Sequence, residues 1–230
     1  MLLKEALPLI KSLCSIKFEE LFLEVPSDIK LNKGKSGQLL ETLIGLRNGN
    51  QLLDFVDGEL KTNKSNEKGE PKETMFITQI SSDFDAILAA DTSFEDTRLF
   101  SKIKNMVYVP VCKVGTTGDG KEKKLDNPDD WFYVDAFTVD LEKNKELCDM
   151  LKQDFNDIRM ELSNQITSRD GFIHTANGGN RMIQVRSKDS KPYHPIYSEK
   201  YGRFISNKNH AFYFRPAFMN YVRLHAEGQS

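Results

Sequence analysis

The sequence has few cysteines and no long apolar run, and both absences exclude classes of protein. Cys14, Cys112 and Cys148 are the three cysteines in 230 residues, and no two of them form a CxxC pair. Their odd number and wide scatter argue against a disulfide framework or a zinc site. No apolar run approaches the length of a membrane span, and residues 1–25 lack the pattern of a cleavable signal peptide. We therefore expect a cytoplasmic protein that does not bind a membrane.

Several catalytic motifs are also missing. The four histidines do not stand at metal-ligand spacing, and no Gly-x-Ser-x-Gly nucleophile elbow occurs. Gly115–Lys121 follows a predicted strand and resembles the glycine-rich part of a phosphate-binding loop. The next residue is Glu122, where that motif needs a hydroxyl for Mg²⁺, and no apolar helix follows. The sequence therefore gives no support to triad hydrolysis or to nucleotide binding.

The charge of the chain is unevenly distributed. The net charge of −2 does not by itself indicate a nucleic-acid ligand. Between Arg181 and Arg223, however, nine basic residues stand against two acidic ones, which gives this segment +7 and leaves −9 for the rest. Tyrosines and phenylalanines are interleaved with the basic residues. Such a segment suits contact with a phosphate backbone, although a surface that is only locally basic explains the same asymmetry.

The hydrophobic pattern predicts a mixture of helices and strands without a βαβ repeat. Helices are predicted over residues 2–24, with a break near Cys14, and over 36–46, 140–165 and 216–225. Strands are predicted over residues 73–80, 105–114, 131–139, 182–185 and 211–214. The length allows one large domain or two small ones. This order of elements predicts an α+β fold with a mixed central sheet flanked by helices.

The stretch from Asp54 to Lys61 is the most informative part of the chain. Two runs with apolar residues meet at Asp57-Gly58, a pair typical of a tight β-hairpin turn. In such a hairpin Asp54, Glu59 and Lys61 project from one face, because side chains alternate along a strand. Two carboxylates and an ammonium on one face form the arrangement of Mg²⁺-dependent nucleases of the PD-(D/E)xK type. A hairpin whose charges simply face water accounts for the same residues.

Glu41 is a further candidate carboxylate. It stands between Gly37 and Gly45 on one face of the predicted helix 36–46, for which Ser36 is the expected N-cap. Because both glycines lack a side chain, another backbone or a ligand can approach that face closely. An exposed glutamate on a frayed helix is the alternative interpretation.

With these features in order, the chain resembles the MutH family, which comprises a mismatch-repair nickase and type II restriction endonucleases that cut at GATC. Lys33-Gly34 through Leu40-Glu41, Asp54-Phe55 and Glu59–Thr62 are similar to family motifs. The resemblance runs almost end to end. The further matching segments are Glu73–Phe76, Lys102–Lys104, Val107–Val111, Asp154-Phe155, Ile166–Arg169, Val185–Lys188 and Phe212-Tyr213.

The resemblance implies a restriction-endonuclease-like fold with two lobes that form a DNA cleft. Residues 1–230 would be a single MutH-like domain, with a catalytic lobe over about 1–140 and a DNA-reading lobe over about 141–230. The catalytic residues implied are Glu41, Asp54, Glu59 and Lys61, with Lys102 supporting them at the scissile phosphate.

The resemblance also implies which residues bind DNA: Lys33, Phe76, Arg186, Lys188 and Tyr213. Phe76 would wedge into the base stack, whereas Arg186 and Lys188 would reach base edges in the major groove. Tyr213 would lie near the adenine whose methylation the family senses. Arginine is the residue expected to read a guanine with two hydrogen bonds.

Asp54, Glu59 and Glu41 are implied to hold Mg²⁺, with Mn²⁺ as a substitute. Carboxylates are the hard oxygen ligands that Mg²⁺ prefers, and the ion can activate a water and neutralise charge that develops on the phosphate. Lys61 can orient or deprotonate that water. Asp57 is an alternative ligand to Asp54, because the segment from Asp54 to Glu59 is two residues shorter than in the family.

Three functions are compatible with these residues. The first is a type II restriction endonuclease at GATC or a related site, the second a mismatch-repair nickase that cuts the unmethylated strand of hemimethylated GATC, and the third a DNA-binding module that no longer cuts. The shorter Asp54–Glu59 segment, Ser187 where the family has proline, and an apparent insertion over Gly171–Arg181 favour restriction. The last two leave the recognised sequence open. Double-stranded DNA is the expected partner, and the expected location is the nucleoid. A mismatch-repair nickase would also have a mismatch-repair ATPase as a partner. A monomer and a transient dimer are both compatible with the sequence.

Overall fold

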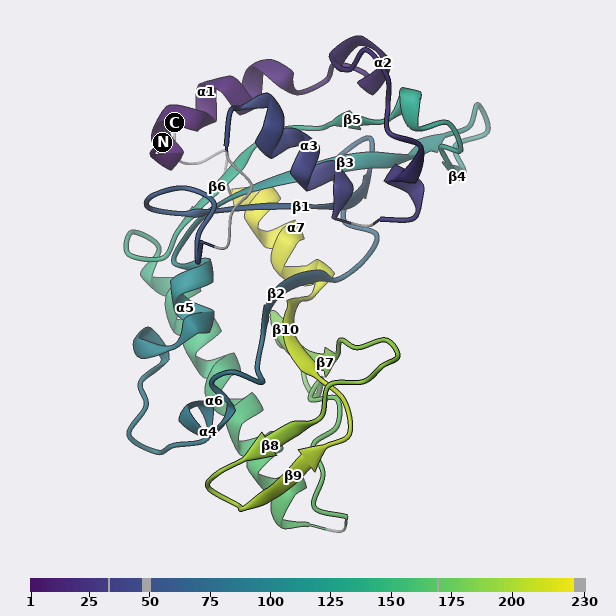
Figure 1. The fold of residues 1–230 in the computed structure, drawn as a ribbon. Coiled ribbons are helices and arrows are strands. Elements are labelled where there is room, and N and C mark those ends of the chain that lie inside the picture. Colours follow the sequence, from purple (N-terminus) through teal and green to yellow (C-terminus); the bar gives the residue numbers. More distant parts are fainter. Residues whose placement is uncertain (33, 47–50, 169, 226–230) are drawn as a thin grey trace. The chain divides into compact units, whose positions relative to one another are not determined.

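The chain forms two compact units that are interleaved along the sequence (Figure 1). The computed structural model describes residues 1–32, 34–46, 51–168 and 170–225. Unit 1 comprises Met1–Met75, Asn105–Asp140 and the segment from Met219, and unit 2 comprises Phe76–Lys104 and Leu141–Phe218. The predicted single domain with consecutive lobes over 1–140 and 141–230 stays a prediction. Helices and a mixed sheet together confirm the predicted α+β class.

Unit 1 is built on a five-stranded mixed sheet around the long strand β3 (Asn105–Thr116). Strand β1 (Glu59–Asn66) pairs with β3 in parallel. Strands β4 (Glu122–Lys124), β5 (Phe132–Tyr133) and β6 (Phe137–Asp140) pair with β3 in the antiparallel sense. Pro110, which has no N–H to donate, lies between the residues of β3 that pair with β6 and those that pair with β5. The sheet therefore accommodates a proline inside a strand that is buried almost throughout.

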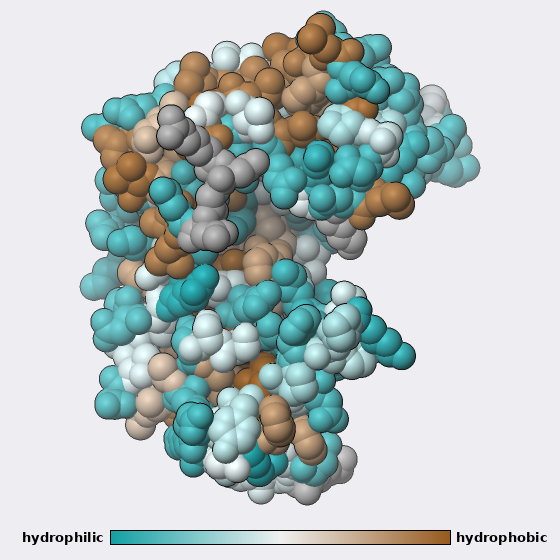
Figure 2. All heavy atoms as spheres, in the orientation of Figure 1, coloured by the Kyte–Doolittle hydropathy of each residue, from teal (hydrophilic) through white to brown (hydrophobic). Residues whose placement is uncertain are grey.

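Helices α1 (Leu3–Leu13) and α3 (Lys35–Leu43) contribute to one core cluster with this sheet. Leu3 and Ile10 of α1 and Leu40 of α3 are buried in it with Leu60 of β1 and Val109 of β3. Each such side chain stabilises the fold by about 1.5–3 kcal/mol when fully buried. The break predicted near Cys14 is confirmed, because α1 ends there and the short helices α2 (Phe18–Leu21) and Ser27–Lys30 follow. Hydrophobic residues gather on the surface over α1 and α2 (Figure 2). Leu9 of α1 and Leu23, two residues beyond α2, are exposed.

A polar contact is buried elsewhere in unit 1. The hydroxyl of Tyr108 donates to Asn63 Oδ1 at 2.8 Å, and Asn63 Nδ2 donates to the sulfur of Met219 at 3.1 Å. Met219 belongs to helix α7 (Pro216–His225), whose predicted position is confirmed. Asn63 thus joins β1, β3 and α7 through its one side chain.

Unit 2 combines a three-stranded sheet with the longest helix. The sheet has the order β2 (Met75–Gln79), β10 (His210–Phe214), β7 (Ile183–Ser187), and β7 and β10 are antiparallel. Helix α6 (Lys145–Thr167) buries the predicted stripe of Leu147, Leu151, Phe155, Ile158 and Leu162. The smaller elements of the chain are α4 (Phe84–Ile87), Phe94–Asp96, α5 (Arg98–Ile103), Pro128–Asp130 and a hairpin of β8 (Ile196–Ser198) and β9 (Arg203–Ser206). No helix among the described residues is both long and apolar enough to cross a membrane.

A buried aspartate fixes the start of β7 to α6. Asp154 Oδ2 accepts hydrogen bonds from the backbone N–H groups of Met182, at 2.5 Å, and Ile183, at 3.1 Å. Burial raises the pKa of this carboxyl, while the two N–H donors oppose that shift. Because Arg186 follows three residues later on β7, Asp154 also sets the position of the segment predicted to read DNA.

We expect Asp154→Ala to lower the free energy of unfolding by about 1–3 kcal/mol, because two buried N–H groups would lose their acceptor. Urea unfolding followed by circular dichroism measures this change. Asp149→Ala, on an exposed position of the same helix, is the matched control and should change stability by less than about 0.5 kcal/mol. Equal stability of the two variants would show that Asp154 does not anchor β7.

Candidate active site

Glu59 and Lys61 open strand β1 and form an ion pair. Lys61 Nζ lies 2.6 Å from Glu59 Oε1, and the two side chains are 12% and 4% exposed. They stand two residues apart on an edge strand, so both project from the same face. A buried carboxylate is costly unless it is paired. Lys61 is therefore fixed beside the carboxylate that it is predicted to assist.

Asp54 joins this pair from the loop before β1. Its Oδ2 accepts a hydrogen bond from the backbone N–H of Leu60, the residue between Glu59 and Lys61, at 2.8 Å. This bond places Asp54 next to the backbone between Glu59 and Lys61, while the predicted catalytic role of the three residues stays a prediction. The hairpin predicted for this stretch is wrong, because residues 52–58 form bends and β1 pairs in parallel with β3.

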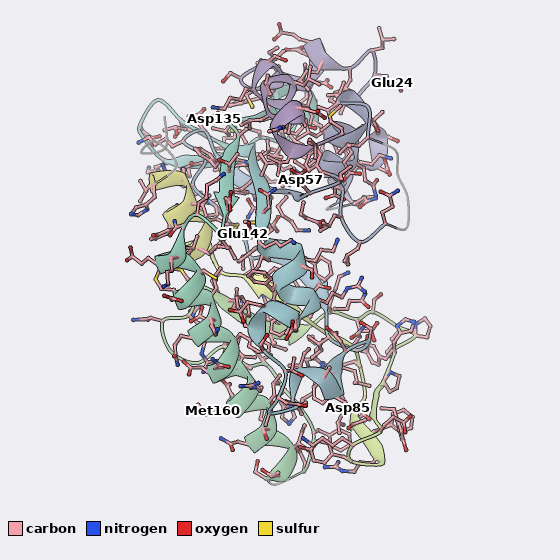
Figure 3. All side chains as sticks on the ribbon, turned by 90° about the vertical axis from the view of Figure 1, so that its left-hand side faces the viewer. Glu24, Asp57, Asp85, Asp135, Glu142 and Met160 are labelled. Atoms are coloured by element: carbon pink, nitrogen blue, oxygen red, sulfur yellow. The ribbon has the colours of Figure 1, made fainter. Side chains whose placement is uncertain are left out.

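The Asp57-Gly58 pair does not form a hairpin turn; it contacts α1 and β3 instead. Asp57, labelled in Figure 3, makes two contacts. Its Oδ1 accepts from the backbone N–H of Leu3 at 2.8 Å, and its carbonyl accepts from Asn105 Nδ2 at 2.7 Å. A Cβ atom at Gly58 would lie 2.9 Å from the carbonyl oxygen of Asn105. Local turn chemistry is overridden here by contacts with α1 and β3. The Asp57 carboxylate is directed to α1, which favours Asp54 over Asp57 as a metal ligand.

Glu41 is brought to the same site by helix α3. A Cβ atom at Gly37 would lie only 3.0 Å from Thr62 Oγ1, so the glycine lets α3 approach β1 closely. Gly45 does not share this face, because α3 ends at Leu43. Ser36 is not the N-cap either: that position is Gly34, and Ser36 is buried, with its hydroxyl accepting from Lys113.

The pKa of Glu41 is affected by the neighbouring carboxylates of Asp54 and Glu59. Burial raises the pKa of Glu41, and the negative charges of Asp54 and Glu59 raise it further, while Lys61 opposes them. Among the described residues, no three His, Cys, Asp or Glu side chains converge closely enough to hold an ion without rearrangement. The donors are nevertheless the hard oxygens that Mg²⁺ prefers. Their mutual repulsion is of the kind that a bound cation relieves.

The residues predicted to read DNA come together in unit 2. Arg186 on β7, Tyr213 on β10 and Phe76 on β2 lie on neighbouring strands. The rings of Phe76 and Tyr213 meet edge to face at 5.7 Å, and Lys188 Nζ lies 4.0 Å from the centre of the Phe76 ring. The guanidinium of Arg186 is 6.0 Å from the Tyr213 ring. These four side chains form the cation–aromatic cluster of unit 2, with Arg186 and Lys188 exposed.

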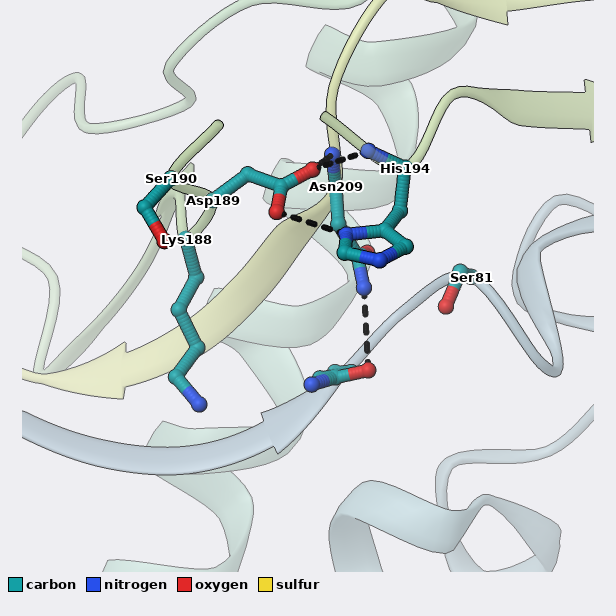
Figure 4. A pocket seen from close by; sticks show the side chains of 7 residues that line it. Ser81, Lys188, Asp189, Ser190, His194 and Asn209 are labelled. Atoms are coloured by element: carbon teal, nitrogen blue, oxygen red, sulfur yellow. Dashed lines mark hydrogen bonds and ion pairs between the residues drawn. The ribbon is translucent and has the colours of Figure 1, made fainter. Parts of the chain in front are cut away.

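A polar pocket that the sequence did not indicate lies beside Lys188 (Figure 4). Asp189 accepts hydrogen bonds from the backbone N–H groups of His194 and Asn209, and its other oxygen lies 2.9 Å from His194 Nδ1. These donors hold the pKa of Asp189 well below its usual range. Asn209 Nδ2 in turn donates to Gln79 Oε1 at 2.9 Å. The one feature of the sequence that could have indicated this pocket is that Asp189 directly follows Lys188, a predicted DNA-binding residue.

Lys102 and Lys33 are the two remaining predicted site residues. Lys102 is on the last turn of α5 in unit 2, a half-buried position next to the buried Ile103. Lys33 lies outside the described residues. Their predicted roles at the scissile phosphate and in DNA binding stay predictions.

Comparison with known proteins finds relatives of one kind. No family model matches the chain. The chain is 32% identical over 116 residues to "DNA mismatch repair protein MutH" of Histophilus somni (strain 2336), and it spans about half, 49%, of that relative's length and 46% of its own. It is 28% identical over 209 residues to the protein of the same name from Shewanella sp. (strain MR-7), with 84% of this chain and 80% of that protein covered.

We expect Glu41→Gln to raise the free energy of unfolding at pH 8 in the presence of a chelator. The pKa of Glu41 is higher in the folded than in the unfolded chain, so the ionised carboxylate destabilises the folded state once the pH exceeds the unfolded value. The gain should shrink as the pH falls and both states become protonated. Urea unfolding at pH 8 and pH 4 measures it. Gln38→Glu, one turn earlier on the same helix, is a control for an added charge, and a gain from Glu41→Gln that does not depend on pH would contradict this account.

Proposed function

The chain belongs to the MutH family, and on that basis we propose that it is a Mg²⁺-dependent DNA endonuclease of the MutH type. The observation that carries the proposal is the proximity of Glu41 and Asp54 to the Glu59–Lys61 ion pair at the start of β1. These are the four residues that stand in the family's catalytic motifs. A restriction-endonuclease-like fold, with two lobes that form a DNA cleft, is part of the same proposal.

The carboxylates and the lysines of the site would have different roles in this chemistry. Asp54, Glu59 and Glu41 would hold Mg²⁺, for which Mn²⁺ would substitute. A bound ion supplies activation of a water and neutralisation of the charge that develops on the phosphate. Lys61, held 2.6 Å from Glu59, would orient the attacking water or take its proton at Nζ. Lys102 would support the scissile phosphate.

Recognition of double-stranded DNA is assigned to unit 2 and to Lys33. Arg186 and Lys188 are exposed cations on and just after β7, which suits contact with base edges. The Phe76 and Tyr213 rings beside them suit a wedge and a contact with adenine. The closely packed cation–aromatic cluster supports the proposal that these residues act together.

Two modes of cutting remain, and a different observation favours each. Ser187 and the segment Gly171–Arg181 depart from the family pattern beside the base-reading strand, which favours a type II restriction enzyme at GATC or a related site. The relatives found are named as mismatch repair proteins, and one match extends over 84% of the chain. That favours a nickase recruited by a mismatch-repair ATPase. A monomer suffices for nicking, whereas a transient dimer suits a double-strand cut.

One assay separates the modes. Purified protein and Mg²⁺ are incubated with unmethylated, hemimethylated and fully methylated plasmid that contains GATC sites. Linear unmethylated plasmid without any partner protein indicates restriction. Nicks restricted to unmethylated or hemimethylated GATC, and stimulated by a mismatch-repair ATPase, indicate repair. Binding without cutting under every condition would overturn the proposed endonuclease and leave a DNA-binding module.

We expect Lys61→Ala to lower the cleavage rate by about 10²–10⁴-fold, the usual contribution of a positioned acid–base group. Glu59→Gln should lower it at least as much, because it removes a proposed ligand of the Mg²⁺ ion. DNA binding measured with Ca²⁺ in place of Mg²⁺ should stay close to that of the parent. Lys68→Ala, an exposed lysine just beyond β1, is the matched control and should cut at the parent rate. Cleavage by either site variant at the parent rate would show that the assignment of the site is wrong.

Arg186→Ala should reduce discrimination between cognate and altered sites by about 1–3 kcal/mol, the range of one bidentate base contact. Affinity for non-specific DNA should fall much less. Competition binding with cognate and single-substituted duplexes measures both quantities. Lys191→Ala removes an exposed cation from the same unit and should leave discrimination unchanged. An Arg186→Ala variant with the parent's preference among sites would exclude the base-reading role.

A further inference from the structure

A second cluster of cations, which we name the lysine pocket, lies in unit 1 beside the candidate active site. It is a cavity of about 260 Å³ enclosed by the Ser27–Lys30 helix, α3, β1 and β3. Thr62, Asn63 and Lys64, which line it, directly follow Lys61 on β1. The remaining lining residues are Ile29, Lys30, Ser36, Glu73, Val111, Lys113, Lys124 and Trp131. None of the lysines was singled out by the sequence.

Lys113 is held rigidly at the centre of this arrangement. Its Nζ donates to Ser36 Oγ at 2.9 Å and lies 4.2 Å from the centre of the Trp131 ring. Ser36 is buried, and its carbonyl accepts from the Tyr133 hydroxyl at 2.8 Å. Trp131 is fixed by its indole N–H, which donates to the carbonyl of Leu125 at 3.0 Å. The ammonium of Lys113 is therefore positioned by a hydroxyl and an aromatic face.

The charges of the pocket are not balanced. Four lysines line it, against Glu73 as the one acidic residue among its described lining, so its net charge is +3. Glu73 Oε1 also accepts from the backbone N–H of Lys64, at 3.4 Å. In the described part of the chain, no carboxylate lies within ion-pair distance of Lys30, Lys64 or Lys113. Burial lowers the pKa of Lys113 to about 8, and Glu73 only partly offsets this effect.

A half-buried ammonium without an ion-pair partner is still costly, so this arrangement needs a reason. A bound phosphate group would explain the arrangement, because a phosphate oxyanion accepts charge-assisted hydrogen bonds from several lysines at once. The position of the pocket along β1 indicates that this phosphate belongs to DNA. Lys64 is three residues beyond Lys61 on β1, about 10 Å further along the strand, and its side chain projects from the opposite face. That distance corresponds to the rise of about three nucleotides in one strand of a duplex.

We propose that the lysine pocket binds a phosphodiester group of the DNA backbone a few nucleotides from the scissile position. Lys113 would be the central contact, with Lys64, Lys30 and Lys124 around it. The pocket would hold the strand in register for cutting and would not read its sequence. This inference rests on the proposed endonuclease function, but it concerns residues outside the catalytic and base-reading sets.

The single tryptophan of the chain makes a direct test available. Because Trp131 lies under the Lys113 ammonium, its fluorescence should respond to a phosphate that enters the pocket. A duplex that contains GATC, titrated with Ca²⁺ present, should change the emission saturably. Inorganic phosphate at the same phosphate concentration should not. Lys113→Met, which keeps an apolar stem over the ring, should abolish the change on duplex binding.

The salt dependence of binding provides a second measurement. Anisotropy titrations of labelled duplex at several salt concentrations should give a slope of log K against log salt that is about 0.9 smaller for Lys113→Met, because one phosphate contact is lost. Lys64→Ala, on the half-exposed edge strand, should reduce the slope similarly and tests the pocket even if Lys113→Met fails to fold. Lys121→Ala, whose side chain is 81% exposed in the same unit, should keep the parent slope.

The possible results are distinguishable. Parent slopes for folded Lys113→Met and Lys64→Ala overturn the lysine pocket while leaving the endonuclease proposal intact. A saturable fluorescence response to inorganic phosphate alone, with an unchanged DNA slope, overturns the DNA backbone as the source and indicates a free anion. Absence of any duplex binding by the parent protein overturns the proposed function itself. Smaller slopes in both variants, with fluorescence that follows duplex alone, support the pocket.

Discussion

The parallel pairing of β1 with β3 is the constraint on which the rest of the structure depends. Parallel neighbours cannot be joined by a tight turn and need a long crossover. Here the crossover runs from Glu67 to Lys104 and carries β2, α4 and α5, so the chain leaves unit 1 and contributes to unit 2 before it returns. The same pairing places Glu59 and Lys61 at the first residues of an edge strand, where Asp54 and Glu41 reach them.

Negatively and positively charged side chains lie at different positions along β1. The carboxylates Asp54, Glu59 and Glu41 gather at its first residues and are offset by Lys61. Three residues on, the lysine pocket carries the opposite sign. A polyanion such as DNA is attracted by the second region and repelled by the first until a cation neutralises the carboxylates. Metal binding and DNA binding are thus expected to be coupled along one strand.

The sequence predicted those elements whose signal is local and repeated. The apolar stripe of α6 and the buried run of β3 emerged because five or more residues carry the same pattern. The hairpin at Asp57-Gly58 was wrong because its signal depends on two residues, and contacts with Leu3 and Asn105 outweigh it. Ser36 failed as an N-cap for the same reason, since Tyr133 and Lys113 from distant strands bind it. The candidate catalytic residues were predicted through motif resemblance, whereas the positions of Asp189 and Lys113 depend on contacts across 20 and 77 residues, which no local pattern records.

The interleaving of the two units also limits how such a protein can change in evolution. Unit 2 consists of two separate stretches, Phe76–Lys104 and Leu141–Phe218, with the central strand β3 of unit 1 between them. A recombination event that exchanges one contiguous gene segment cannot replace unit 2 without also replacing that strand. Change within unit 2 alone must therefore arise by point substitution or by growth of a loop, such as the one before β7.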